Sequence, residues 1–157
     1  MASNLFFVAV FCLTSGLWVG ANVNTCKTCP DGWVRFKDSC YQYHHTAKDW
    51  ADAERTCIRL HGNLASIHSK EEHDFIQHLI HRATGKDGQT HIGGHDTAKE
   101  GAWMWSDGTP FDFKGLWGPG QPDNAHHREH CLELNYRRAP NDNQCKIAKP
   151  FVCGMHL

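Results

Sequence analysis

Residues 121–145 read QPDNAHHREHCLELNYRRAPNDNQC, and this stretch carries the pattern on which the interpretation of the chain depends. Gln121, Asp123 and Glu129 precede the first of its two cysteines, and Asn141 and Asp142 precede the second. Carboxylates and amide carbonyls in flexible loops are the oxygen ligands that Ca²⁺ prefers. The stretch therefore predicts one calcium site made by these five side chains, with coordination positions left for water or a ligand hydroxyl.

The second half of the chain, from residue 88 onward, is rich in glycine, tryptophan, aspartate and proline and has little periodicity. Residues 103–105 and 132–134 are its strand candidates. A long irregular stretch inside a compact domain is usually held by disulfides or a metal ion and carries the function. A cis bond before Pro122 would turn its two flanking side chains to one side.

The first half of the chain has the periodicity of two helices. Apolar residues recur at helical spacing over residues 47–60, which predicts a first helix with Thr46 as its N-cap. Ser69 and Glu72 have the spacing of a capping box and predict the start of a second helix. Gly85 is expected to end that helix.

The first 21 residues have the character of a secretory signal peptide. An apolar run begins at Leu5, and the small residues Val19, Gly20 and Ala21 predict cleavage after Ala21. The run is short for a transmembrane helix, although a signal anchor is the alternative. We expect a secreted protein whose mature chain has a short N-terminal segment, 22–28, and one domain, 29–157.

The cysteines of the mature chain are odd in number. Cys12 leaves with the signal peptide, and an oxidising compartment favours pairing of the rest. Three bridges leave one spare thiol, which we expect within residues 26–29 near the new N-terminus, with Cys26 as the candidate. A disulfide-linked homodimer through this thiol is the expected outcome, and a thiol capped by a small molecule is the alternative.

Composition and charge exclude several classes of protein. Sixteen Lys and Arg side chains against seventeen Asp and Glu side chains leave a formal net charge of -1, without the positive surface that nucleic acids require. No second apolar run follows residue 21, so no membrane insertion is expected. The chain has no nucleophile elbow or ordered triad, and Asp123 and Glu129 are better explained as metal ligands than as a glycosidase pair, so we expect no enzyme.

These motifs together resemble the C-type lectin-like domain in its long form, over residues 29–157. The resemblance implies an α+β fold with two helices, two small antiparallel sheets and a long loop region. It also implies three bridges, Cys29–Cys40, Cys57–Cys153 and Cys131–Cys145. The family's Trp-Ile-Gly-Leu motif is altered to residues 91–94, and its Trp-Asn-Asp motif to residues 140–142, both at the aromatic position.

The same resemblance implies the site and its ligand. Gln121, Asp123, Glu129, Asn141 and Asp142 match the family's principal calcium ligands, around which two vicinal sugar hydroxyls complete the calcium shell. The acid oxygens accept hydrogen bonds from those hydroxyls, and the amides donate to them. The order Gln-Pro-Asp is associated with galactose-type sugars, so the resemblance implies a lectin that binds galactose-containing glycans or lactose, with an agglutinating or innate-defence role.

Two positions depart from the family pattern. Ala125 stands where galactose-type members usually have a tryptophan that stacks on the sugar, and His126, His127 and Trp117 are the candidates to replace it. His130 stands where members usually have an aspartate that helps an auxiliary calcium ion, so we expect no second calcium ion.

Three alternatives are kept beside this interpretation. The histidines at 126, 127 and 130 could bind zinc, or be a solvated loop. Fish type II antifreeze proteins have the same fold and a Gln-Pro-Asp site, so ice binding is the second alternative, in place of sugar binding. A protein-binding module without sugar binding is the third.

Overall fold

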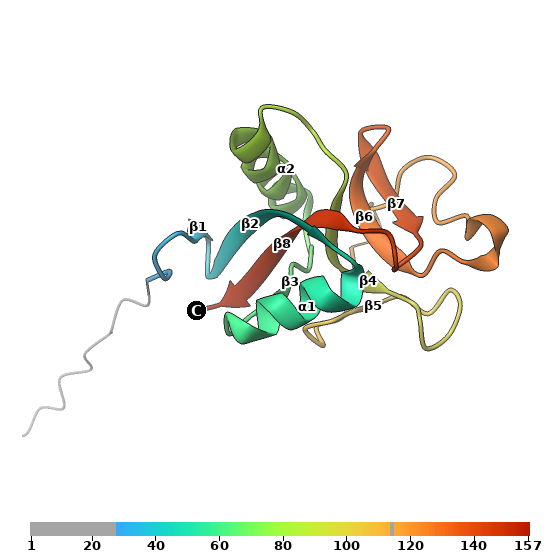
Figure 1. Cartoon of the computed structure of the whole chain (residues 1–157), viewed down its shortest axis with the longest axis horizontal. Coiled ribbons are helices and arrows are strands. Elements are labelled where there is room, and N and C mark those ends of the chain that lie inside the picture. Colours follow the sequence, from blue (N-terminus) through green and yellow to red (C-terminus); the bar gives the residue numbers. More distant parts are fainter. Residues whose placement is uncertain (1–27, 114) are drawn as a thin grey trace, which may run out of the picture.

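The computed structural model describes residues 28–113 and 115–157, which form two α-helices and one β-sheet (Figure 1). The predicted signal peptide and Cys26 lie outside the described residues. The helices are α1 (Trp50–Arg59) and α2 (Lys70–Thr84), and η1 (Ala125–His127) is a short 3-10 turn. The strands are β1 (Val34–Phe36), β2 (Ser39–Lys48), β3 (Asn63–Leu64), β4 (Thr90–His95), β5 (Met104–Trp105), β6 (Cys131–Tyr136), β7 (Ala139–Asn143) and β8 (Lys149–His156).

The α+β class is confirmed, while the arrangement of the sheet differs from the expected two sheets. The strand order is β1-β2-β8-β4-β6-β7, with β3 beside β8 and β5 beside β4. Neighbouring strands pair antiparallel in the group β1-β2-β8 and in the group β4-β6-β7. Between the two groups, β4 and β8 pair in parallel at His91 and Phe151. This one pairing joins two antiparallel groups into a single mixed sheet. Local sequence patterns do not show it, because the two strands are far apart along the chain.

Helix α2 begins and ends where the sequence predicts. Ser69 is its N-cap and accepts a hydrogen bond of 3.2 Å from the backbone N–H of Glu72. The Glu72 carboxylate accepts from the backbone N–H of His68 at 2.7 Å rather than from that of Ser69, so the reciprocal half of the capping box is displaced by one residue. Gly85 ends the helix in the left-handed conformation, with φ of 72°.

Helix α1 starts later than the sequence predicts, and the assignment of Thr46 as its N-cap is wrong. Strand β2 continues to Lys48, which pairs with Lys149 of β8. Asp49 is the N-cap and accepts a hydrogen bond of 2.8 Å from the backbone N–H of Asp52. Pairing with β8 thus extends the strand through residues whose local pattern favours a helix.

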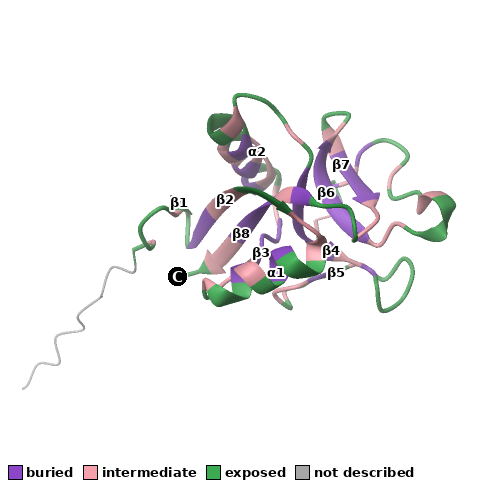
Figure 2. Ribbon diagram, in the orientation of Figure 1, coloured by how far each residue is buried: buried purple, intermediate pink, exposed green. Residues whose placement is uncertain are grey.

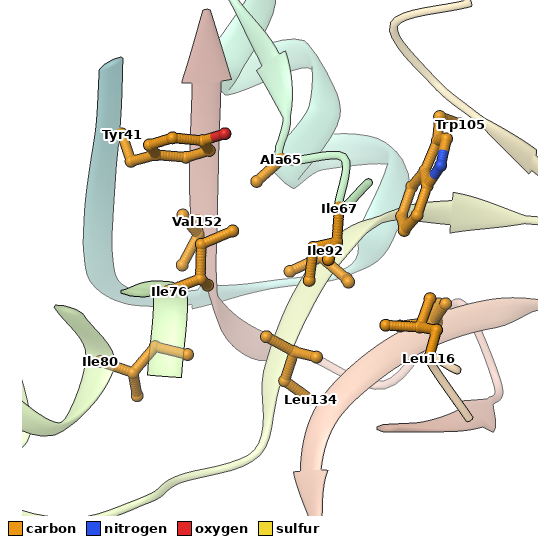
Figure 3. Packing of buried hydrophobic residues seen from close by; sticks show 11 residues of the cluster. Tyr41, Ala65, Ile67, Ile76, Ile80, Ile92, Trp105, Leu116, Leu134 and Val152 are labelled. Atoms are coloured by element: carbon orange, nitrogen blue, oxygen red, sulfur yellow. The ribbon is translucent and has the colours of Figure 1, made fainter. Parts of the chain in front are cut away.

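The two helices pack on opposite faces of β8, whose side chains alternate between them. Val152 lies in the core cluster that includes Ile76 and Ile80 of α2 (Figure 3). Phe151 and Cys153, which are two residues apart, pack with α1. This alternation is the period of a strand buried on both faces. Figure 2 shows how burial concentrates in β4, β6 and β8, while residues 119–130, the loop directly before β6, are intermediate or exposed.

The structure closes three disulfide bridges, which are the pairs implied by the resemblance: Cys29–Cys40, Cys57–Cys153 and Cys131–Cys145. The second joins α1 to β8, and the third joins the start of β6 to the segment after β7. The end of the loop that carries Gln121, Asp123 and Glu129 is therefore fixed covalently to the segment that follows β7, the strand with Asn141 and Asp142. In the described ranges neither helix is both long and apolar enough to cross a membrane.

Candidate functional site

The candidate site lies where the loop before β6 meets the edge strand β7. Asn141 and Asp142 are in β7, and both are buried. Gln121, Asp123 and Glu129 come from the loop. The bond between Gln121 and Pro122 is cis, the form that would turn its two flanking side chains to one side.

Three carboxylates of the predicted ligand set converge. One oxygen from each of Asp123, Glu129 and Asp142 lies within 4.8 Å of the other two. Gln121 and Asn141 line one small cavity of about 120 Å³ together with Asp123 and Glu129. The structure therefore brings together all five side chains that the sequence indicated, from segments as far apart as residues 121 and 142.

Backbone N–H groups of the loop hold two of these carboxylates. Asp142 accepts hydrogen bonds from the backbone of Asp123 at 3.1 Å and of Asn124 at 2.7 Å. Glu129 accepts from the backbone of Ala125 at 3.1 Å, and its own N–H donates to the side chain of Asn124, also at 3.1 Å. The loop is thus folded around the acidic groups.

The loop backbone is unusual in its conformation. Asn124, His126 and His127 have positive φ values of 42°, 59° and 56°. Residues other than glycine seldom adopt this region, although Asn and His do so more often than most. Side-chain bonds to Asn124 and to the acidic groups compensate for this conformation.

The electrostatics of the cluster fit a hard cation. Partial burial raises the pKa of Glu129 above its usual range, and the negative charges of Asp142 and Asp123 raise it further. Three acidic groups that repel one another, with amide oxygens beside them, form the donor set that Ca²⁺ binds. A bound cation would remove this repulsion. The residues present therefore fit the calcium ion that the sequence predicted.

The cavity is small, about 120 Å³, and its lining is mostly polar: Gln121, Asp123, Glu129, Asn141 and Asn143 share it with Ala125 and Tyr136.

The aromatic candidates from the sequence do not line this cavity. Trp117 packs against Trp103, with ring centroids 4.6 Å apart, and belongs to the edge of the core. His126 and His127 are exposed and lie outside the lining. Tyr136, the last residue of β6, does line the cavity. Tyr136 was not among the residues that the sequence indicated, because it lies two residues beyond the strand expected at 132–134, which the structure extends to Tyr136.

His130 lies at a second acidic group beside the site. Its Nδ1 is 3.0 Å from an oxygen of buried Asp96 and 3.4 Å from an oxygen of Glu100. His126 and His127 do not join it: among the described residues, the two groups with convergent metal-ligand atoms contain neither histidine. The structure thus does not assemble the predicted zinc alternative at residues 126, 127 and 130.

Comparisons with known proteins agree with this geometry. The family model described as the lectin C-type domain matches residues 46–155. The galactose-specific lectin nattectin of Thalassophryne nattereri is 46% identical, and the alignment covers 100% of both chains. The lactose-binding lectin l-2 of Anguilla japonica is 37% identical, with 96% of this chain and 94% of that protein covered.

A solved structure extends the likeness to the fold. The herring type II antifreeze protein superposes with a TM-score of 0.75 at 31% identity, over 82% of this chain and 99% of that one. The family model covers more than half of the chain and includes both helices and all five converging side chains. The chain belongs to the C-type lectin family.

Proposed function

We propose that this chain is a secreted lectin that binds galactose-type sugars through one calcium ion. Gln121, Asp123, Glu129, Asn141 and Asp142 would hold the ion, which when bound supplies open coordination positions for two vicinal sugar hydroxyls. The observation that carries the proposal is the convergence of three carboxylate oxygens within 4.8 Å, beside two amide side chains.

The order of the ligands around Pro122 supports the choice of sugar. The amide of Gln121 and the carboxylate of Asp123 differ in whether they donate to or accept from a hydroxyl, so their order selects the hydroxyl arrangement. Two full-length relatives are named as galactose-specific and lactose-binding lectins. Both names favour galactose over mannose for this chain.

Tyr136 supplies the aromatic surface in this proposal. It lines the same cavity as Gln121 and Asp123 and is only partly buried. The Arg137 guanidinium lies 5.2 Å from the centre of its ring. The remaining ring surface would receive the apolar face of a galactose unit, the role that a tryptophan at position 125 would otherwise have.

The biological setting is part of the same proposal. Cleavage after Ala21 would release the chain, and Cys26 would link two copies in a homodimer. Two linked sites raise the avidity for a glycan-covered surface without any new contact, because the second binding event becomes intramolecular. Such a dimer suits an agglutinating role in innate defence.

The test is binding of the purified mature chain to immobilised galactose and immobilised mannose, each with calcium and with a chelator. We expect binding to galactose that the chelator abolishes and that readdition of calcium restores. Galactose binding that persists in the chelator would contradict the calcium mechanism, and a preference for mannose would contradict the choice of sugar.

Ice binding is a second candidate, favoured by the 31% identity and TM-score of 0.75 to the herring antifreeze protein. A type-2 ice-structuring protein of Hemitripterus americanus is also 40% identical over 81% of this chain. Thermal hysteresis of the purified chain, together with absence of sugar binding, would favour this function over the lectin.

A further inference from the structure

A fully buried carboxylate lies directly behind the candidate calcium site. Glu133 is in the middle of β6 and has no solvent-exposed surface. Its pairing partner on β7 is Asn141, and its partner on β4 is His91. Glu133 is therefore the neighbour of one proposed calcium ligand across a pair of strands, where side chains on the same face are in contact.

One oxygen of this carboxylate accepts hydrogen bonds, and the other has an ion-pair partner and, among the described residues, no hydrogen bond. Oε1 accepts hydrogen bonds from the side-chain amides of Asn141 at 3.0 Å and Asn143 at 2.8 Å. Oε2 lies 2.9 Å from the ammonium group of Lys149, whose side chain is only 8% exposed. The ion pair thus connects β8 through Glu133 to the amide of a proposed ligand on β7.

The chemistry of the carboxylate decides how the Asn141 amide is turned. An ionised carboxylate only accepts hydrogen bonds, so the amide atom that faces it must be the NH₂ group. The same NH₂ group also donates to the backbone carbonyl of Asp142. Because the nitrogen is held on this side, the carbonyl oxygen of Asn141 is left at the opposite edge of the planar amide group, and it is this oxygen that a calcium ion requires.

Lys149 keeps this arrangement in place. The ammonium group of Lys149, 2.9 Å from Oε2, balances the charge of the buried carboxylate and holds Glu133 where its Oε1 meets the Asn141 amide. The pair therefore acts as an orienting element and not only as a contribution to stability.

We propose that Glu133 and Lys149 are positioning residues for calcium: they orient the Asn141 amide so that its oxygen faces the cation site before the ion arrives. The inference rests on the proposed calcium function. Orientation before binding would spare the cost of turning the amide when the ion binds, and removal of such a partner behind a ligand typically lowers metal affinity by about ten- to a hundredfold.

The first experiment compares calcium affinity by titration calorimetry in the wild-type chain and in Glu133→Gln. The substitution keeps the shape but adds an NH₂ donor and removes the charge, so the amide of Asn141 is no longer forced into one orientation. We expect calcium affinity to fall by about ten- to a hundredfold. The matched control is Glu54→Gln, which alters another buried carboxylate; Glu54 binds Asn63 and Leu64 and does not line the cavity. The control should lose stability without losing calcium affinity.

A rescue variant separates orientation from general damage. Combining Glu133→Gln with Asn141→Asp gives a ligand that presents an oxygen whichever way it turns, and the amide introduced at 133 can donate to its other oxygen. We expect this double variant to regain most of the lost affinity. If Glu133→Gln alone fails to fold, the double variant Glu133→Gln with Lys149→Met takes its place in the comparison, because it also removes the buried charge that Lys149 would keep without a partner.

A readout without calcium tests the same arrangement directly. In the chelated wild-type chain, the side-chain NH₂ protons of Asn141 should exchange slowly with solvent in NMR spectra, because Glu133 holds them, and they should exchange faster in Glu133→Gln. Equal exchange rates, or calcium affinity in folded Glu133→Gln equal to that of the wild type, would overturn the inference. Failure of the wild-type chain to bind calcium at all would instead contradict the proposed function, while the exchange rates would still decide whether Glu133 orients Asn141.

Discussion

The carboxylate of Asp142 accepts a hydrogen bond of 3.1 Å from the backbone N–H of Asp123. This bond joins the edge strand β7 to the loop that supplies three of the proposed calcium ligands. The Cys131–Cys145 bridge connects the same two regions, since it links the residue after the loop region to the segment that follows β7. The loop is therefore already held near its partners on β7 before any ion binds.

Removal of one carboxylate should separate calcium affinity from stability. Glu129→Gln deletes a ligand charge, and we expect calcium affinity to fall by more than about tenfold. Because burial and the neighbouring carboxylates raise the pKa of Glu129, its ionised form destabilises the calcium-free fold at neutral pH. The melting temperature in chelator should therefore stay equal or rise. Calorimetry and thermal unfolding check both effects, with the exposed Glu71→Gln as a control that changes neither.

The order of ligands around Pro122 should determine the choice of sugar. The double substitution Gln121→Glu with Asp123→Asn keeps one carboxylate and one amide but exchanges their places. Calcium binding should persist, since the charge is conserved, while affinity for galactose falls and affinity for mannose rises. Glycan binding measured on both immobilised sugars checks this. Unchanged galactose affinity would place the sugar elsewhere on the molecule.

Tyr136 should contribute to the affinity for sugar and not to the affinity for calcium. In Tyr136→Ala, galactose binding should weaken by roughly fivefold, the equivalent of about 1 kcal/mol for an aromatic contact. Calcium affinity should remain that of the wild type, because no ligand oxygen is removed. Tyr136→Phe is the matched control and should bind galactose nearly as well. A loss of calcium affinity in Tyr136→Ala would show instead that the ring supports the loop.

The calcium-free chain should lose stability in mild acid because of its buried histidines. Burial lowers the pKa of His91 below 6.5 because it disfavours the charged ring, and this effect outweighs the opposing one of the Ile147 carbonyl, to which Nε2 donates at 2.8 Å. The unfolded chain then binds this proton at a higher pH than the folded chain does. Stability is therefore full above pH 6.5 and falls as the pH drops from there toward the lowered value.

Burial lowers the pKa of His44, His73 and His95 in the same way. We expect the melting temperature in chelator to fall by several degrees between pH 7.5 and pH 5.5. His91→Gln should reduce this pH dependence, whereas the exposed His78→Gln should leave it unchanged. A melting temperature that stays constant over this range would contradict the prediction.

The covalent dimer depends on a single thiol in our proposal. Cys26→Ser should run as a monomer on a gel without reductant, whereas the wild-type chain should run as a dimer that reductant separates. The three bridges within the domain should form in both, since their partners are already paired with one another. A covalent dimer that persists in Cys26→Ser would contradict the assignment of the spare thiol.

Local patterns predicted the elements whose boundaries are set by neighbouring residues. The Ser69 cap and the Gly85 stop of α2 are interactions over a few residues, and both occur where the sequence indicated. Helix α1 was less predictable, because Lys48 pairs with distant Lys149 and so extends β2 past Thr46. The joining of two antiparallel groups into one sheet was equally beyond local patterns, since it depends on the contact of His91 with Phe151.

The sequence by itself determined the two helices and the identity of the five oxygen-bearing side chains that converge, because these features follow from residue type and spacing along the chain. The family and the α+β class came from the resemblance of its motifs to the C-type lectin-like domain. Only the tertiary structure decided that Tyr136 lines the cavity, that Trp117 packs against the core, and that Glu133 and Lys149 stand behind Asn141. The physical reason is that burial and hydrogen-bond partners depend on which strands become neighbours, and that choice is made by packing across the whole domain.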